Sequence, residues 1–340
     1  MKNKTALVTG ITGQGGAYLS QLLINRGYKV VGTTRDSRLA SLKGLEFLGI
    51  ASDVEVLSLQ YRNRRRVEDV IDGLRPDEIY HLASPSSVAR SFVVPGETTE
   101  DIVMSTVNIL DGIRRIDRDI RFFNAASIEM YGRSKSRINE LSPLSPLSPY
   151  GVAKSATFLQ TRNYREAYGV YACSGILSNF ESPLRPASFV TSKIVSAASR
   201  IAAGDRNTLH LGNISIHRDW GFAQDHMDAA WKMLQQDNPE DFVIATGKSY
   251  SLEDFLNFAF EACGLDYRQH VTIDDSLLRP LDIEQSVGDP SRANQRLEWR
   301  AQHELRDVIE IMINAQKTEY ELGTNSDSIS ESNVKIFPQR

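Results

Sequence analysis

Near its start the chain reads Thr5-Ala6-Leu7-Val8-Thr9-Gly10-Ile11-Thr12-Gly13-Gln14-Gly15-Gly16. An apolar run of β type ends at Gly10, and a helical pattern follows from Ala17 to Ile24. Glycines at Gly-x-x-Gly-x-x-Gly spacing allow a tight turn and a close approach of the backbone to a pyrophosphate. The helix N-terminus would offer free N–H groups to the phosphates. A glycine turn without a ligand is the alternative, but its place between strand and helix favours dinucleotide binding.

Short apolar β-type runs alternate with helical patterns along the first half of the chain. The further predicted strands are residues 29–33, 54–59, 78–82, 121–125 and 172–177, and the predicted helices are residues 17–24, 67–74, 103–113, 151–168 and 189–203. Right-handed crossovers place the helices of such a chain on both faces of one sheet. The pattern therefore predicts an α/β fold: a Rossmann-type doubly wound parallel sheet with a smaller mixed α/β domain.

The regular alternation loosens after Tyr150, and this change sets the expected domain boundaries. We expect residues 1–177 and about 215–247 to form the Rossmann domain, and about 178–214 with 248–322 to form the smaller one. The proline-punctuated stretch 142–149 is expected to lead into Tyr150 as a rigid extended segment. Residues 323–340 are rich in Ser, Asn and Asp and are expected to be a mobile tail.

The charge balance and cysteine content exclude several classes of protein. The chain has 39 Lys and Arg against 43 Asp and Glu, and this net charge of -4 argues against a nucleic-acid partner. No apolar run approaches the ~20 residues that span a bilayer, and the N-terminus lacks the apolar core of a secretion signal. Only Cys173 and Cys263 are present, which is typical of a reducing compartment. We predict a cytoplasmic protein without a membrane partner.

The residues after the second predicted strand bear on the choice of dinucleotide. They read Thr33-Thr34-Arg35-Asp36-Ser37-Arg38. An acidic residue at this place favours a free ribose 2′-hydroxyl, whereas an arginine favours a 2′-phosphate. Arg35 comes first, and Arg38 is close enough to share the charge of a 2′-phosphate. Asp36 favours NAD instead. We expect NADP rather than NAD, with a solvated charged loop as the alternative.

Tyr150 and Lys154 form a Tyr-x-x-x-Lys pattern at the start of a predicted helix. Their spacing puts both side chains on one helix face. A lysine ammonium beside a phenol lowers the pKa of the phenol. Such a phenolate, held near a nicotinamide, could take a hydroxyl proton while the ring accepts a hydride. A surface pair is the alternative, but the position after the fifth predicted strand favours catalysis.

These features together give the chain a family resemblance. With the glycine turn and the Ala-Ala-Ser segment after a strand, it resembles the extended short-chain dehydrogenases/reductases, and among them the GDP-mannose 4,6-dehydratases. The likeness runs from about residue 4 to about residue 322. Further matching segments are Pro76 to Tyr80, Ser148 to Lys154, Asn163 to Gly169, Phe189 to Thr191, Arg218 to Gly221 and Asp241 to Gly247.

The resemblance implies a role for each catalytic residue. Tyr150 would deprotonate the sugar 4-hydroxyl as hydride leaves C4, with Ser127 bonded to the 4-oxygen and Lys154 beside the phenol. Glu129 would take the C5 proton and then protonate the hydroxyl that leaves C6, before hydride returns to C6. This chemistry needs a carboxyl that both accepts and donates a proton. A surface or ion-paired carboxylate is the alternative for Glu129.

The resemblance also implies binding residues and no metal site. For NADP these are Gly10, Thr12, Gly13, Gln14, Gly16, Arg35, Gln60, Leu82, Ala83, Tyr150 and Lys154. For the nucleotide sugar they are Ser86, Asn179, Val190, Lys193, Arg218 and Arg279. Arg218 and Arg279 would clamp the diphosphate, since arginine suits paired anionic oxygens.

Several positions depart from the family pattern. Ser127 stands where the family has threonine, and Gln60 stands where it has an adenine-binding aspartate. After the fourth predicted strand the chain reads Leu82-Ala83-Ser84-Pro85-Ser86-Ser87-Val88, where the family reads Leu-Ala-Ala-Gln-Ser-His-Val. Leu184-Arg185 falls where some family members form a tetramer and share a cofactor site, so a homodimer and a homotetramer both stay open.

The sequence therefore predicts a nucleotide-sugar 4,6-dehydratase acting on GDP-mannose or a related GDP-hexose or heptose. The alternative enzyme is a nucleotide-sugar 4-epimerase or 4-ketoreductase that uses the same Tyr150 and Lys154. The third hypothesis is a catalytically silent dinucleotide sensor or scaffold. The presence of both Tyr150 and Lys154 disfavours it.

Overall fold

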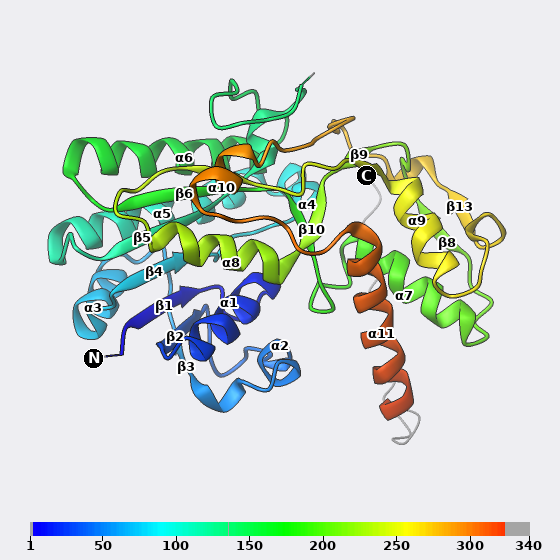
Figure 1. The fold of residues 1–340 in the computed structure, drawn as a ribbon, viewed down its shortest axis with the longest axis horizontal. Helices are drawn as coiled ribbons and strands as arrows, with labels where there is room; N and C mark the ends of the chain where they lie inside the picture. Colours follow the sequence, from blue (N-terminus) through cyan, green and yellow to red (C-terminus); the bar gives the residue numbers. More distant parts are fainter. Residues whose placement is uncertain (1–2, 135, 324–340) are drawn as a thin grey trace.

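Seven parallel strands form the central sheet of the protein (Figure 1). The computed structural model describes residues 3–134 and 136–323. From one edge to the other the strands are β3 (Val54–Ser58), β2 (Lys29–Thr34), β1 (Thr5–Thr9), β4 (Glu78–His81), β5 (Arg121–Ser127), β6 (Ala172–Leu177) and β11 (Phe242–Ile244). The strand order reverses between β1 and β4, the place where open α/β sheets bind their ligands.

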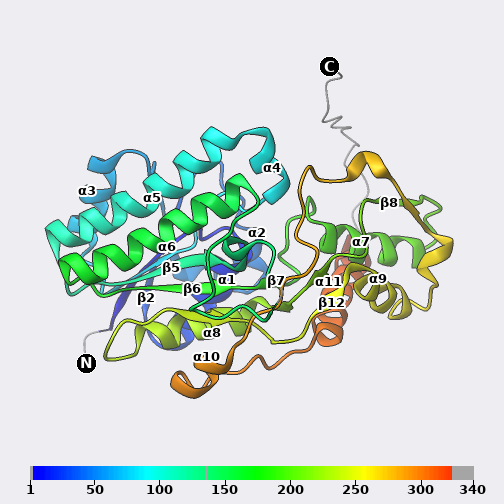
Figure 2. The ribbon, with the colours of Figure 1, turned by 90° about the horizontal axis from the view of Figure 1, so that it is seen from above.

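Helices cover both faces of the sheet in three layers, as Figure 2 shows from above. One face carries α1 (Gln14–Asn25) and α8 (Ala223–Leu234), which pack on each other. The other face carries α3 (Arg64–Leu74), α5 (Pro95–Ile116) and α6 (Pro149–Tyr168). The predicted doubly wound Rossmann-type fold is therefore confirmed.

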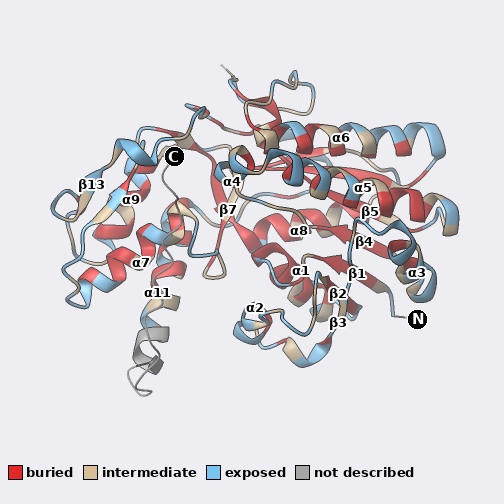
Figure 3. Cartoon of the chain, turned by 180° about the vertical axis from the view of Figure 1, so that it is seen from behind, coloured by how far each residue is buried: buried red, intermediate tan, exposed pale blue. Residues whose placement is uncertain are grey.

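Buried side chains alternate between two cores along the strands. Leu7 and Ile79 belong to the core under α3, α5 and α6, whereas Val8 and Tyr80 belong to the core under α1 and α8. Figure 3 shows the strands as buried and the outer helix faces as exposed. A parallel sheet covered on both sides has apolar residues at consecutive positions, which explains the unbroken apolar runs in the sequence.

A second group of elements lies beside the sheet, at the right of Figure 1. Its helices α7 (Val190–Ala202), α9 (Leu252–Glu261) and α11 (Leu305–Gly323) pack on one another, and β8 (Leu209–Leu211) pairs with β13 (Val271–Ile273). Two strand pairs lie between the two groups: β7 (Asn179–Glu181) with β10 (Trp220–Phe222), and β9 (His217–Arg218) with β12 (Tyr250–Ser251). The shorter elements are α2 (Lys43–Phe47), α4 (Val88–Val93), α10 (Ser291–Arg296), η1 (Ala51–Asp53), η2 (Ile128–Tyr131), η3 (Tyr267–Gln269) and η4 (Asp275–Leu277).

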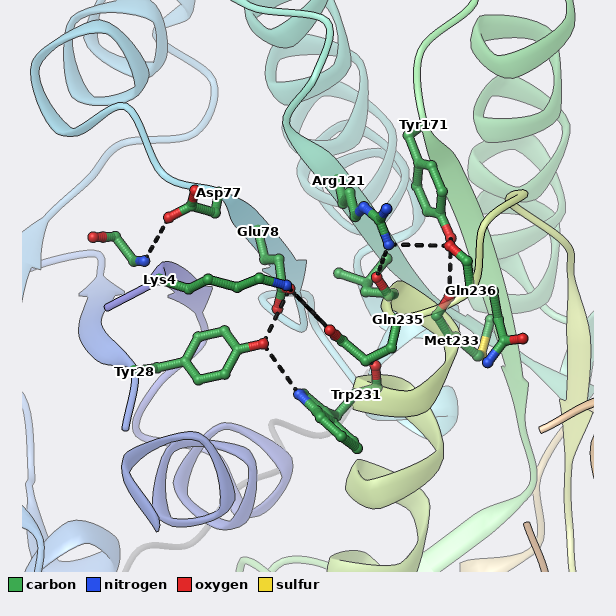
Figure 4. A network of polar contacts seen from close by, with 12 residues as sticks. Lys4, Tyr28, Asp77, Glu78, Arg121, Tyr171, Trp231, Met233, Gln235 and Gln236 are labelled. Carbon is green, nitrogen blue, oxygen red and sulfur yellow. Dashed lines mark hydrogen bonds and ion pairs between the residues drawn. The ribbon is translucent and has the colours of Figure 1, made fainter. Parts of the chain in front are cut away.

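A buried carboxylate joins several elements at the amino end of the strands (Figure 4). The Glu78 carboxylate accepts hydrogen bonds from Lys4 at 2.8 Å, Tyr28 at 3.1 Å, Tyr80 at 2.7 Å and Gln235 at 3.2 Å. These donors belong to or adjoin β1, β2, β4 and α8. A buried charge with all these hydrogen-bond partners is satisfied. The network therefore holds the amino ends of these strands together, at the end of the sheet opposite the glycine turn.

The six predicted strands are confirmed, with ends within two residues of the observed ones. Four of the five predicted helices start earlier than predicted, whereas α7 starts one residue later, at Val190. The largest difference is in α5, which begins at Pro95 instead of 103 because its first turns are polar and lack the apolar period. The short strand β11 was not predicted. Helix α10 packs on β11 although it falls in the range expected for the second domain. Most of the expected mobile tail, from residue 324 on, lies outside the described residues.

Candidate active site

The glycine turn between β1 and α1 has the geometry of a phosphate cradle. Gly10 has φ +72°, and a Cβ there would lie 2.9 Å from the backbone of Ala83. A Cβ on Gly16 would lie 2.3 Å from the Gly10 carbonyl oxygen. Gly13 precedes α1 in an extended conformation, and no side chain caps the helix. The first turn thus keeps N–H groups for an anion, which fits the pyrophosphate of a dinucleotide.

Thr9 connects this turn to the end of β4. Its hydroxyl accepts the backbone N–H groups of Leu82 at 3.1 Å and Ala83 at 3.0 Å, and it lies 2.9 Å from His81 Nδ1. Burial, helped by the charge of Lys154, lowers the pKa of His81 to about 3. His81 is therefore neutral and stabilises the walls of the crevice. The sequence analysis missed both Thr9 and His81, whose polar side chains inside apolar strands were the available signal.

Gln14 lies in the turn as predicted, but its side chain is bonded within the protein. Its Nε2 donates to the Phe180 carbonyl at 2.9 Å, and its Oε1 accepts from the Ser182 hydroxyl at 2.7 Å. Thr12 is exposed at the same turn. The Gln14 side chain thus connects the predicted cofactor crevice to the segment that follows β7.

The tip of β2 presents one unpaired arginine. Arg38 forms an ion pair with Asp36 at 3.0 Å, so the expectation that Arg38 shares a cofactor charge is not supported by its geometry. Arg35 is exposed and has no ion pair within the described part of the chain. Gln60 is also exposed, and its Nε2 donates to the Arg35 carbonyl at 3.1 Å. Arg35 and Gln60 therefore lie together at the end of the crevice.

Tyr150 and Lys154 lie in the first turns of α6, where Ser148 caps the helix by accepting the Gly151 N–H. The Lys154 ammonium donates to the Ala125 carbonyl at 2.8 Å and to the Ser84 hydroxyl at 3.0 Å. It lies 5.7 Å from the centre of the Tyr150 ring. Burial lowers the pKa of Lys154 to about 8. Tyr150 and Lys154 therefore lie on one face of α6, as the sequence predicts.

The pKa of Tyr150 differs from the prediction. Burial raises it to about 12, and the charge of Glu129 acts in the same direction. A hydrogen bond with Ser127 and the charge of Arg185 lower the pKa of the phenol, and Lys154 is not among the groups that affect it. The expectation that Lys154 lowers the pKa of Tyr150 is thus wrong for the protein alone, because burial outweighs any nearby positive charge.

Ser127 is the last residue of β5 and Glu129 lies in η2, and both interact with Tyr150. The Ser127 hydroxyl accepts the Glu129 backbone N–H at 3.3 Å and begins η2. Burial raises the pKa of the half-buried Glu129 carboxyl, and the charges of Arg218 and Arg279 oppose this rise. A carboxyl with a raised pKa can both accept and donate a proton near neutral pH.

The predicted substrate residues fall into two sets. Arg218 and Arg279 are brought together by Asp282, which accepts from Arg218 at 2.8 Å and contacts Arg279 at 3.4 Å. The sequence analysis missed Asp282, for which only its three-residue spacing from Arg279 was a signal. The other four are exposed Ser86 before α4, Asn179 at the start of β7, Val190 at the start of α7 and exposed Lys193. No hydrogen bond joins any two of these four in the described structure.

Comparison with known proteins shows the family to which the chain belongs. A model of the GDP-mannose 4,6 dehydratase family matches residues 7–312. The chain belongs to this family. It is similar to GDP-mannose 4,6 dehydratase 1 of Arabidopsis thaliana, with 39% identity over 320 residues that cover 91% of this chain and 89% of that protein.

Two solved structures show the same fold at lower identity. UDP-glucose 4-epimerase from Thermotoga maritima has a TM-score of 0.82 at 20% identity and covers 93% of this chain and 99% of its own. dTDP-glucose 4,6-dehydratase from Bacillus anthracis has a TM-score of 0.82 at 17% identity. The match covers 94% of this chain and 98% of that chain. Epimerase and dehydratase match equally well, so the fold alone does not distinguish the two reactions.

The described residues form neither a metal site nor a membrane-spanning helix. No group of three or more His, Cys, Asp or Glu side chains there could hold a metal ion. Among the same residues, no helix is both long enough and apolar enough to cross a bilayer. Both cysteines, Cys173 and Cys263, are free thiols.

Proposed function

We propose that this member of the family converts GDP-mannose to its 4-keto-6-deoxy derivative by removal of water. The observation that carries the proposal is the position of Glu129 next to Ser127 and near enough to Tyr150 for its charge to raise the pKa of that phenol, with a carboxyl whose own pKa burial raises. A simple dehydrogenase or epimerase has no use for such a carboxyl. The names of the curated relatives support the same reaction.

Each of the four catalytic groups has one task in this proposal. Tyr150 takes the proton of the 4-hydroxyl, with Ser127 bonded to the same oxygen. Glu129 then takes the C5 proton, which the new 4-ketone has made acidic, and gives it to the hydroxyl that leaves C6 as water. Tyr150 returns its proton to C5 at the end, so both side chains regain their first protonation states. A nicotinamide held by the glycine turn would supply the hydride chemistry, removal from C4 and return to C6.

The ammonium of Lys154 is the positive charge that assists the transfer of the 4-hydroxyl proton to Tyr150. Its two hydrogen bonds, to Ala125 and Ser84, fix its position below Tyr150. One of its three N–H donors remains for a ligand. In this proposal the ammonium favours the phenolate, which must be present before Tyr150 can take the 4-hydroxyl proton. In the protein alone, burial raises the pKa of the phenol to about 12.

We propose NADP as the cofactor, held by the glycine turn and by Arg35, with Gln60, Leu82 and Ala83 beside it. The support is that Arg35 is exposed and has no ion pair with any residue that the structure describes, whereas Asp36, which would favour NAD, is paired with Arg38. A guanidinium without an anionic partner suits a 2′-phosphate. In this proposal residues 1–177 and about 215–247 bind the cofactor.

We propose that about 178–214 and 248–322 bind the nucleotide sugar. Arg218 and Arg279 would hold its diphosphate, and Asn179, Val190 and Lys193 the rest of the nucleotide. Exposed apolar residues on α5 and α6, namely Met104, Val152 and Leu159, support self-association of the cytoplasmic protein as a dimer or tetramer.

The test uses the full chain with NADP and GDP-mannose deuterated at C4. Dehydration predicts loss of one water, with the deuterium recovered at C6 of the product, because one cofactor molecule carries it. The alternative 4-epimerase or 4-ketoreductase would retain all the oxygen atoms and give a C4 epimer or consume NADPH. Mass spectrometry of the product separates these outcomes, and UDP-, CDP- and dTDP-sugars tested in parallel identify the base.

A further inference from the structure

Asp282 lies between the two arginines that act on Glu129. Its Oδ1 accepts a hydrogen bond from Arg218 Nη2 at 2.8 Å, contacts Arg279 Nη1 at 3.4 Å, and accepts the Ile283 backbone N–H at 2.9 Å. The Asp282 side chain is 23% exposed, whereas that of Arg218 is 5% exposed. One carboxylate therefore faces two positive charges at the edge of the crevice.

Arg218 does not depend on Asp282 for its position. Its Nη1 also donates to the Ile283 carbonyl at 2.6 Å and to the His217 carbonyl at 2.9 Å. These bonds hold the guanidinium in the β9 segment and leave further N–H donors for a ligand. What Asp282 adds to Arg218 is therefore mainly its negative charge.

The charges in this cluster balance before a ligand arrives. Arg218 and Arg279 contribute two positive charges, and Asp282 contributes one negative charge, as does Glu129 when it is ionised. A diphosphate would add more negative charge next to Asp282. Like charges at close range in a partly buried site repel each other. Asp282 thus opposes binding of the anion that its two arginine partners attract.

We propose that Asp282 is a positioning residue that acts through its charge: it offsets the two arginines and keeps Glu129 fit for proton transfer, at a cost in diphosphate affinity. This inference rests on the proposed function, in which Glu129 both takes and gives a proton. It assigns Asp282 a role through charge and not through direct contact with the substrate.

The electrostatics of Glu129 agree with this role. Burial is the main cause of its raised pKa; Arg218 and Arg279 lower the pKa, and Asp282 raises it. Glu129 in turn acts on Tyr150, whose pKa its charge raises. Without Asp282, the two arginines would act on Glu129 unopposed and would make it a weaker base and a poorer proton acceptor.

The first test measures binding and needs no turnover. Asp282→Asn removes the charge but keeps an oxygen that can accept from Arg218 and Ile283, and Asp282→Ala is a second charge-removing variant. Glu284→Gln is the matched control, because Glu284 is exposed on the same segment. Isothermal titration of the NADP-loaded protein with pyrophosphate, GDP and uncharged guanosine gives the affinities.

We expect both Asp282 variants to bind pyrophosphate and GDP about three- to tenfold more tightly, with guanosine unchanged. The control and Asp282→Glu should match the wild type. Equal or weaker pyrophosphate binding in Asp282→Asn would overturn the proposal, since it would show that the carboxylate only holds the arginines in place.

The second test is the pH dependence of kcat. Asp282→Asn should move the acid limb, where Glu129 must be ionised, to lower pH by about one unit. A purely structural role would leave this limb in place, and that result would also contradict the proposal. If the wild type fails to dehydrate GDP-mannose, the proposed function is wrong, whereas the pyrophosphate titration still tests Asp282 on its own.

Discussion

The ammonium of Lys154 donates to the hydroxyl of Ser84 at 3.0 Å, which joins α6 to the loop after β4. The bond gives the buried ammonium a second oxygen besides the Ala125 carbonyl. A hydroxyl that accepts from a charged donor stabilises the charged form of that donor.

Replacing Ser84 with alanine should therefore weaken catalysis and shift its alkaline limb. Burial already lowers the pKa of Lys154 to about 8. Loss of an acceptor destabilises the ammonium, so its pKa falls further and the alkaline limb of the kcat profile moves to lower pH. We expect kcat to fall about fivefold. Ser84→Thr keeps the hydroxyl and should keep the wild-type profile; an unshifted limb in Ser84→Ala would show that Ser84 does not affect Lys154.

Replacing Tyr150 with phenylalanine should stop the first hydride transfer. The variant keeps the ring in its buried place but removes the only proton acceptor proposed for the 4-hydroxyl. We expect a loss of at least about 10²-fold in the rate of cofactor reduction, followed by absorbance in a single turnover. Tyr164→Phe, on the same helix but in the core under α3 and α5, is the control. Normal reduction by Tyr150→Phe would mean that another group takes the proton.

Replacing Arg35 with alanine tests the choice of cofactor. The guanidinium is exposed and unpaired in the described structure, so its removal should weaken NADP binding by about tenfold to a hundredfold and leave NAD binding nearly unchanged. Arg38→Ala is the matched control, because Arg38 is engaged by Asp36. Titration with both dinucleotides gives the ratio. An equal loss for NADP and NAD would contradict recognition of a 2′-phosphate by Arg35.

Two buried histidines predict how stability depends on pH. Burial lowers the pKa of His81 to about 3 and that of His226 to about 4, from 6.5 in each case. The unfolded chain binds these protons at higher pH than the native protein does. The free energy of unfolding should therefore decrease as pH falls below 6.5, by up to about 1.4 kcal/mol per pH unit for each histidine.

Urea unfolding at pH 7, 6 and 5 measures this dependence. His81→Gln and His226→Gln should each reduce the slope of unfolding free energy against pH, whatever their effect at pH 7. His210→Gln, at an exposed position in β8, should leave the slope unchanged. A wild-type slope in both buried variants would show that other groups cause the acid instability.

The sequence predicts most of the sheet because its strands are buried on both faces. Their runs of Val, Ile, Leu and Phe carry the signal without tertiary information. The glycine turn and the Tyr150–Lys154 pair are equally local, since a turn and one helix face fix their geometry. The start of α5 was missed because its first turns are polar.

The candidate site was predicted less completely, because parts of it depend on contacts between distant segments. Thr9 bonds to the residues that follow β4, Gln14 bonds to β7, and Asp282 contacts Arg218 across 64 residues of chain. No spacing rule predicts these contacts. The pKa of Tyr150 was wrongly predicted for the same reason, because it depends on burial by the whole fold and not on the lysine four residues away.

The most direct test of the account is Glu129→Gln with GDP-mannose and NADP in a single turnover. The amide keeps the shape of the side chain but cannot take the C5 proton. The account predicts that NADPH absorbance still rises, because NADP takes the C4 hydride and Tyr150 takes the hydroxyl proton without help from Glu129, while water loss falls by about 10²- to 10⁴-fold. Water loss at the wild-type rate would contradict the account, because some other group would then carry the proton from C5 to the leaving hydroxyl.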